Sequence, residues 1–127
     1  MKKLLILLFS ILISFNSYGE LKNIIKNLNG TAFYVYNDTI KKHNGYVYYW
    51  SLIDFSAPNS FGDRSVKGFY QADCGLNKKK LLTAIWYEQP MGTGKFVTEN
   101  YDNPEWDYSP PESAIESVVE YACDYVK

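Results

Sequence analysis

The middle of the chain, residues 31–99, consists of short apolar and aromatic runs separated by polar, glycine or proline positions. Alternation is clearest in residues 46–55, where Tyr46, Tyr48 and Trp50 fall on one face of an extended chain and the residues between them fall on the other. β-branched and aromatic residues are frequent in the other runs too, as expected of strands. Strands are therefore predicted at residues 31–36, 40–43, 46–55, 66–74, 81–88 and 95–99.

The segments between these runs are short and rich in turn-forming residues. Asn44 and Gly45 form a pair that readily adopts the positive φ angles of a tight hairpin. Residues 56–65 predict a loop, residues 77–80 a polar connector, and residues 89–94 a second tight turn. Connections this short predict antiparallel neighbours, because parallel strands need crossovers of a dozen or more residues.

The C-terminal segment changes to a helical period. Ser109, two prolines and Glu112 predict the helix start, with Ser109 as the N-cap and Glu112 as its capping-box partner. Beyond them, apolar residues recur at helical spacing and predict a stripe that packs on one face of the sheet. This stripe consists of Ile115, Val118, Val119, Ala122 and Val126.

The first residues have the composition of a secretory signal peptide at residues 1–19. Lys2 and Lys3 precede an apolar run of about 12 residues, and small residues stand before a cleavage position after Gly19. A membrane span needs roughly 20 apolar residues, so a retained anchor is the weaker interpretation. We therefore expect an exported mature chain, residues 20–127, that forms a single domain and carries no transmembrane segment.

The chain has two cysteines, Cys74 at the end of a predicted strand and Cys123 beside the apolar stripe of the helix. In a short exported chain an even cysteine count indicates a disulfide, and no spacing typical of a redox motif is present. A Cys74–Cys123 disulfide would fasten helix to sheet. The predicted fold class is α+β: an antiparallel meander sheet of about five to six strands with one C-terminal helix packed on it, tied by a disulfide.

Composition argues against several function classes. Of the 127 residues, 17% are aromatic and 21% are charged, a balance that argues against intrinsic disorder. The formal net charge of -1 argues against a nucleic-acid partner. Two cysteines and one histidine exclude a zinc site of four Cys/His ligands or an iron–sulfur cluster bound by this chain alone. We expect no metal and no cofactor.

Charge is distributed unevenly along the mature chain. Residues 20–98 hold 10 Lys/Arg against 6 Asp/Glu, whereas residues 99–127 hold 1 against 8. The ordinary interpretation is a solvated surface. The alternative is a basic face that meets an acidic partner.

Aromatic and basic residues supply the candidates for a protein-binding surface. The aromatic residues of the strand at 46–55 either lie in the core or form an exposed patch of the kind enriched at protein interfaces, including that of a homodimer. Tyr34, Tyr36 and Tyr87 would extend such a patch. The lysines of the connector at 77–80 form either a solvated turn or a basic corner of this surface. The candidate protein-binding residues are Tyr46, Tyr48, Trp50, Lys78, Lys79 and Lys80.

No arrangement of residues in the sequence predicts catalysis. His43 is the only histidine and stands beside a predicted turn, and no nucleophile-elbow motif accompanies it. Residues 91–95 superficially resemble a phosphate-binding loop, but Gln89 and Phe96 stand where that motif needs Gly and Ser or Thr. We therefore expect a protein that is not an enzyme.

The order of these features resembles the surface-adhesin protein E family of Gram-negative bacteria. The similarity covers residues 31–125 and depends on the order of several loose motifs and on the placement of the cysteines. The motifs are residues 49–55, the strand 65–74 ending in Ala72-Asp73-Cys74, residues 91–94, Trp106-Asp107-Tyr108 before Ser109-Pro110-Pro111-Glu112, and the helix containing Cys123.

The resemblance implies an antiparallel sheet with a C-terminal helix tied by Cys74–Cys123, and a place in the cell envelope. From the family's namesake it also implies adhesion to host matrix or serum proteins. The namesake resembles a lipid-anchored protein, whereas this sequence has no cysteine near the predicted cleavage position. The expected function is an exported binding module in the periplasm or at the cell surface of a Gram-negative bacterium. The alternative is a small periplasmic protein that binds another envelope protein and has no host role.

Overall fold

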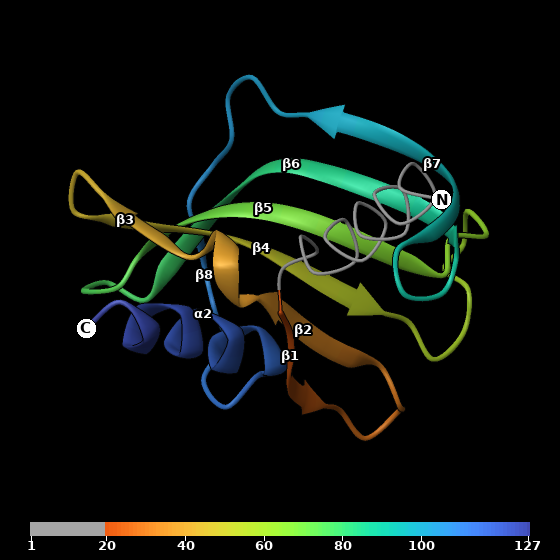
Figure 1. The fold of residues 1–127 in the computed structure, drawn as a ribbon, viewed down its shortest axis with the longest axis horizontal. Coiled ribbons are helices and arrows are strands. Elements are labelled where there is room, and N and C mark those ends of the chain that lie inside the picture. Colours follow the sequence, from red (N-terminus) through yellow and green to blue (C-terminus); the bar gives the residue numbers. More distant parts are fainter. Residues whose placement is uncertain (1–19) are drawn as a thin grey trace, which may run out of the picture.

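The computed structural model describes residues 20–127, so the predicted signal peptide lies outside the described residues. Its elements (Figure 1) are β1 (Leu21–Lys26), β2 (Ala32–Tyr36), the 3-10 turn η1 (Asn37–Thr39), β3 (Lys41–His43), β4 (Tyr46–Asp54), β5 (Ser65–Asp73), β6 (Lys78–Gln89), β7 (Thr93–Asn100), β8 (Asp107–Tyr108) and α2 (Ala114–Tyr125). Across this part of the chain, no helix has the length and apolar character needed to cross a membrane.

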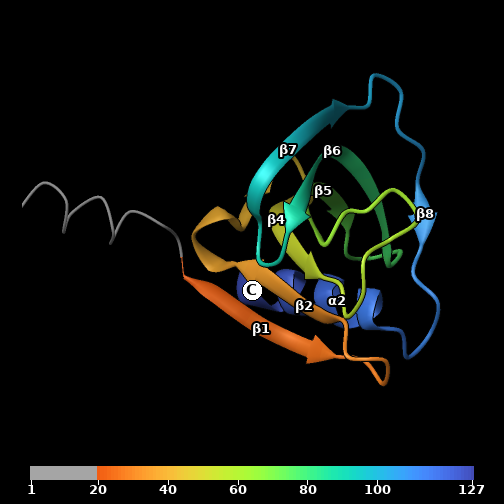
Figure 2. The same cartoon turned by 90° about the vertical axis from the view of Figure 1, so that its right-hand side faces the viewer.

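The strands form one antiparallel sheet. Its path runs β1-β2-β4-β5-β6-β7, while β3 pairs with β4 and β8 pairs with β6. Successive strands are mostly neighbours in space, which confirms the predicted meander, and β1 and β7 lie at opposite edges (Figure 2). The sheet has eight strands, more than the five to six expected from the sequence.

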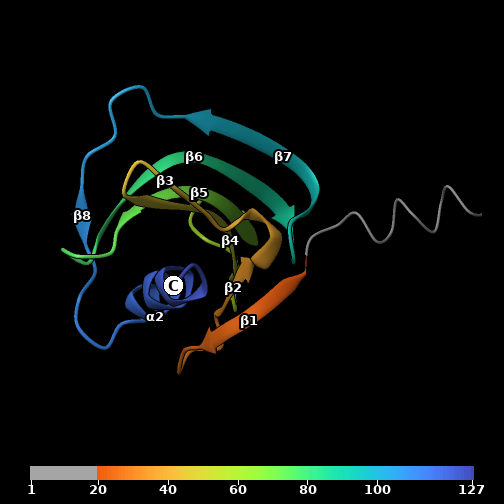
Figure 3. The same ribbon diagram turned by 60° about the vertical axis from the view of Figure 1, so that its left-hand side comes forward.

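Helix α2 lies in the curve of the sheet, next to β1, β2 and β4 (Figure 3). The predicted apolar stripe is confirmed, because its central residues Val118, Val119 and Ala122 are buried. They pack with Val35 and Tyr49 of the sheet in one hydrophobic core. Burying a large apolar side chain contributes roughly 1.5–3 kcal/mol, so this face holds the helix in place.

The predicted disulfide is present. Cys74 follows β5 and Cys123 lies in α2, with 5.9 Å between their Cα atoms, a distance usual for a disulfide. The bridge spans 49 residues of sequence and fastens the helix to the end of β5. The α+β fold class is therefore confirmed.

Helix α2 begins later than predicted. Ser113, and not Ser109, is the N-cap, and its hydroxyl accepts a hydrogen bond from the backbone N–H of Glu116 at 3.1 Å. Glu112 has a φ of 61°, which is not helical, and its N–H donates to the Glu116 carboxylate at 3.1 Å. The serine-x-x-glutamate pattern occurs twice, from residue 109 and from residue 113. The local pattern alone does not distinguish these two capping boxes, so the prediction of Ser109 as the N-cap is wrong.

Two strands are not predicted by the hydrophobic pattern. The ladder between β1 and β2 shifts register between Asn23 and Ile25, which interrupts the alternation that marks a strand. β1 is also an edge strand, where polar residues such as lysine are common. β8 has only two residues and forms by pairing with Lys78 and Lys79 of β6.

Candidate functional site

The sheet face turned away from α2 carries the aromatic residues that the sequence singles out. On β4, Val47 and Tyr49 are buried in the core with the helix. Because side chains alternate along a strand, Tyr46, Tyr48 and Trp50 lie on the opposite face. All three are half-buried, so their rings are held by neighbours and still reach the surface.

Aromatic rings from three segments of the chain stack along this face. The Phe69 ring of β5 lies 5.1 Å from the Trp50 ring and 6.1 Å from the Tyr48 ring, between centroids. Trp106, which precedes β8, packs on Tyr46 at 5.6 Å. Ring pairs at such distances contribute about 0.5–1.5 kcal/mol beyond simple burial. We call the surface formed by these five residues the aromatic face.

Two of the three predicted lysines border the aromatic face. The Nζ atoms of Lys78 and Lys80 lie 4.7 and 4.5 Å from the centre of the Trp106 ring. A cation over an indole face is attracted to its π-electrons, so the ring holds both side chains in place. The structure thus brings Tyr46, Tyr48, Trp50, Lys78 and Lys80 together.

Lys79 does not belong to this surface. The connector predicted at residues 77–80 is wrong, because β6 already begins at Lys78 and its pairing with β5 continues through these lysines. Alternation then places Lys79 on the helix side of the sheet. Lys79 is only 6% exposed, and its Nζ forms an ion pair with Oδ2 of Asp107 at 3.0 Å.

A cavity of about 260 Å³ lies at the Trp50 end of the aromatic face, and we call it the Lys67 cavity. Turn η1 forms one wall. The Thr39 hydroxyl accepts a hydrogen bond from the Trp50 backbone N–H at 3.0 Å and donates one to the Tyr36 carbonyl at 2.6 Å. The lining residues are Tyr36, Thr39, Trp50, Lys67, Ile85 and Tyr87.

The Lys67 ammonium lies between two tyrosine rings, with Nζ 5.3 Å from the centre of the Tyr36 ring and 5.4 Å from that of Tyr87. Burial lowers the pKa of Lys67 from its ordinary value. Burial, and next the neighbouring Tyr87, raises the pKa of Tyr36 to about 12. The cavity therefore combines aromatic and apolar walls with a positive charge.

The turn between β6 and β7 lies against the stem of Lys67. The backbone N–H of Met91 donates to Oδ1 of Asp54 at 2.8 Å, and that of Gly92 donates to Oγ of Ser65 at 2.9 Å. Gly92 has a φ of +66°, and a Cβ there would lie 2.8 Å from Cε of Lys67. A glycine at this position therefore leaves the room that the lysine stem occupies.

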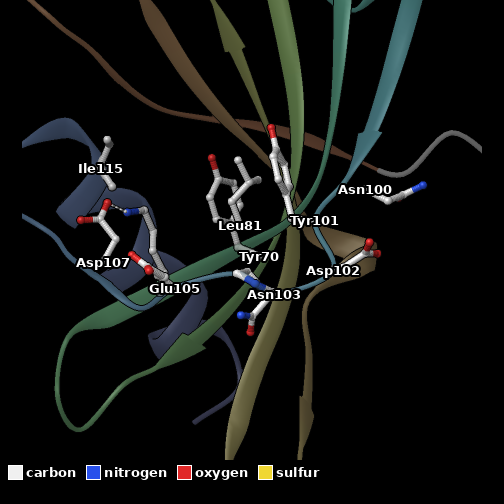
Figure 4. A pocket seen from close by; sticks show the side chains of 11 residues that line it. Tyr70, Leu81, Asn100, Tyr101, Asp102, Asn103, Glu105, Asp107 and Ile115 are labelled. Atoms are coloured by element: carbon white, nitrogen blue, oxygen red, sulfur yellow. Dashed lines mark hydrogen bonds and ion pairs between the residues drawn. The ribbon is translucent and has the colours of Figure 1, made fainter.

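A larger hollow of about 600 Å³ opens on the helix side of the sheet (Figure 4). Tyr70 and Leu81 come from the sheet and Ile115 comes from the start of α2. Residues 100–105 and Asp107 come from the segment that runs from the end of β7 to β8. Burial raises the pKa of Tyr70 to about 12, although a hydrogen bond from Ser51 opposes this. The carboxylates in this segment give the hollow an acidic rim, in contrast to the cationic Lys67 cavity.

His43 lies apart from both cavities, at the exposed end of β3. Its Nε2 is 3.2 Å from the side-chain amide of Asn44, and its ring is 6.3 Å from that of Tyr48. The single histidine thus sits at a hairpin tip.

Three residues of the site, Lys67, Phe69 and Trp106, are not among the candidates from the sequence. Lys67 and Phe69 join it because β5 pairs with β4 in a register that sets them opposite Leu52 and Trp50. The alternation of residues 66–74 was a usable signal, but it needed this register. Trp106 carries no periodic signal, because it comes from a loop.

The chain belongs to the surface-adhesin protein E family. The family's sequence profile, described as surface-adhesin protein E, matches residues 21–124, which is most of the chain. The resemblance expected from the sequence motifs is therefore confirmed. A search of curated proteins found no match.

Solved structures of Haemophilus influenzae protein E have a similar fold. Crystal form II of that protein gives a TM-score of 0.63 at 16% identity, covering 84% of this chain and 90% of that chain. Protein E from non-typeable Haemophilus influenzae gives a TM-score of 0.56 at 14% identity, covering 84% of this chain and 77% of that chain. At these identities the likeness shows a common fold.

Proposed function

We propose that this chain is an exported, adhesin-like module that binds a protein partner, a host matrix or serum protein, through its aromatic face. The observation that supports the proposal is the series of half-buried rings at Tyr46, Tyr48 and Trp50, bordered by the cations of Lys78 and Lys80. Membership of the surface-adhesin protein E family supports the adhesin class.

The composition of the aromatic face suits a protein interface. Tyrosine and tryptophan are enriched among the residues that dominate binding energy. The rings already stack on one another, so little conformational freedom is lost when a partner binds. Trp50 contacts both Phe69 and the Lys67 cavity, so its truncation should have the largest effect, about 2 kcal/mol or roughly 30-fold in affinity.

Binding of the purified mature chain, residues 20–127, to immobilised matrix and serum proteins tests this proposal. Trp50→Ala should weaken binding by at least tenfold. Phe61→Ala is the matched control, because Phe61 is 89% exposed in the loop between β4 and β5 and lines a different hollow, with Trp86 and Val97. Thermal unfolding checks that both variants fold. Failure of every protein in the panel to bind, or equal binding by Trp50→Ala, would contradict the proposal.

Location separates this function from its alternative, a small periplasmic protein that binds another envelope protein. Disulfides form and persist in oxidising compartments, and the periplasm and the cell surface are both oxidising. The Cys74–Cys123 disulfide therefore does not separate the two locations. Protease added to intact cells should digest the chain if it is displayed at the surface. Protection until the outer membrane is permeabilised would support the periplasmic alternative, and mass spectrometry of the N-terminus tests cleavage after Gly19.

A further inference from the structure

We propose that the aromatic face binds an extended acidic segment of its protein partner, with one carboxylate in the Lys67 cavity and a second beside Lys78 and Lys80. This inference rests on the proposed function and specifies the chemistry of the partner. It is drawn from the placement of three cations along one face of the sheet, with aromatic rings between them.

The first binding position is the Lys67 ammonium, which has aromatic neighbours but no anionic one. No carboxylate lines its cavity, and none of the ion pairs formed within residues 20–127 involves Lys67. Partial burial without a counter-charge disfavours the charged form, consistent with the lowered pKa of this lysine. A ligand carboxylate would offset that cost through a charge-assisted hydrogen bond.

The size and lining of the Lys67 cavity suit a side chain rather than a cofactor. Its volume of about 260 Å³ is below the usual range for drug-sized ligands. Trp50 and Ile85 supply apolar walls for the methylene groups of an acidic side chain. The cavity therefore fits a glutamate or aspartate that projects from a longer chain.

The second position follows from the strand register. Lys67 and Gln71 are four residues apart on β5, and Gln71 pairs with Lys80 of β6. At about 3.3 Å per residue, Lys67 and Gln71 lie about 13 Å apart along β5, and we take this as the approximate spacing of the two positions. An extended segment of five residues covers this distance from its first to its last residue, and its first, third and fifth side chains point to one face. An apolar third residue would then lie over Phe69, between two acidic residues.

Matched peptides test this spacing. The probe is a blocked five-residue peptide with glutamate at both ends and tyrosine in the centre, and its twin carries glutamine at both ends. Backbone and indole NMR shifts of the whole mature chain report the affinity and the location. We expect the glutamate peptide to shift the signals of Lys67 and Trp50, and the glutamine twin to bind at least about tenfold more weakly, since hydrogen bonds to charged groups contribute most.

Lys67→Met keeps the aliphatic stem and removes the charge, so it should abolish the preference for the glutamate peptide. Lys26→Met is the control, because Lys26 is exposed on β1 at the far edge of the sheet. Equal affinity for the two peptides, a preference that survives in Lys67→Met, or the absence of binding would each overturn the inference. Concentration-dependent self-association that shifts the same signals would also overturn it, because a second copy of the chain would then occupy the face in place of a partner protein.

The two proposals fail in different ways. If a host protein binds the wild type and Lys67→Met equally but binds Trp50→Ala poorly, the aromatic face is the site and the acidic ligand is wrong. If Trp50→Ala binds that protein as the wild type does, the proposed function is wrong, whatever the peptides show.

Discussion

The ion pair between Lys79 and Asp107 leads to an asymmetric prediction, because its two partners are unequally buried. The Lys79 side chain is 8% exposed and the Asp107 side chain is 76% exposed, with 3.0 Å between Nζ and Oδ2. Removing the carboxylate leaves an ammonium in the protein without its partner, whereas removing the lysine leaves a carboxylate in water. We therefore expect Asp107→Asn to destabilise the fold more than Lys79→Met.

The structure sets the size of this difference. Asparagine keeps an oxygen that can accept a hydrogen bond but removes the negative charge, and leaving a nearly buried ammonium without its counter-charge costs about 1–3 kcal/mol. The hollow beside Lys79 is open to water, so we expect Asp107→Asn to lower the free energy of unfolding by about 2 kcal/mol. In Lys79→Met an apolar side chain replaces the lysine stem beside Tyr70 and Leu81, and the cost should be below about 1 kcal/mol. Asp107→Asn should then cost almost nothing in the Lys79→Met background, a coupling of about 2 kcal/mol.

Urea unfolding of the wild type, the two single variants and the double variant measures these energies. Asp124→Asn is the matched control, because the Lys127–Asp124 pair has a similar distance of 3.1 Å but side chains that are 78% and 69% exposed. That pair should contribute at most about 0.5 kcal/mol. If Asp107→Asn costs no more than this control, or less than Lys79→Met, then burial of the ammonium does not determine the energy.

Three further predictions concern the disulfide, a buried tyrosine and the turn beside Lys67. Replacing both Cys74 and Cys123 by alanine should lower the free energy of unfolding by about 4 kcal/mol, as loop closure over 49 residues predicts, and a thermal melt would contradict this if the midpoint barely moved. Because burial raises the pKa of Tyr70 from 10.0 to about 12, the contribution of Tyr70 to stability is intact below pH 10 and should fall by roughly 1 kcal/mol per pH unit up to pH 12, in addition to the contributions of Tyr36 and Tyr49; urea unfolding should show a shallower loss in Tyr70→Phe, and an equal loss in the two proteins would show that Tyr70 is not buried in this way. Gly92→Ala should destabilise the chain by about 1–2 kcal/mol and displace Lys67, and NMR shifts confined to the turn would contradict the contact.

Much of the fold follows from patterns that act over a few residues. The side-chain alternation of residues 46–55, the Asn44–Gly45 turn and the helical stripe each depend on local geometry, and each is found in the structure. The Cys74–Cys123 pairing was predictable because the chain has no other cysteine. The sequence by itself therefore determined the fold class, the helix-to-sheet bridge and the common face of Tyr46, Tyr48 and Trp50.

Only the tertiary structure decided which lysines are buried, which are exposed and what surrounds each of them. Pairing with β5 extends β6 through all three neighbouring lysines. Because side chains alternate along a strand, Lys78 and Lys80 border the aromatic face, whereas Lys79 is buried on the helix side. Lys67 lies between two tyrosine rings only because the folded sheet brings Tyr36 at the end of β2 and Tyr87 of β6 next to it. Gly92 leaves room for the Lys67 stem. Burial and strand register depend on contacts between segments far apart in sequence, and such contacts leave no periodic signal in any one of those segments.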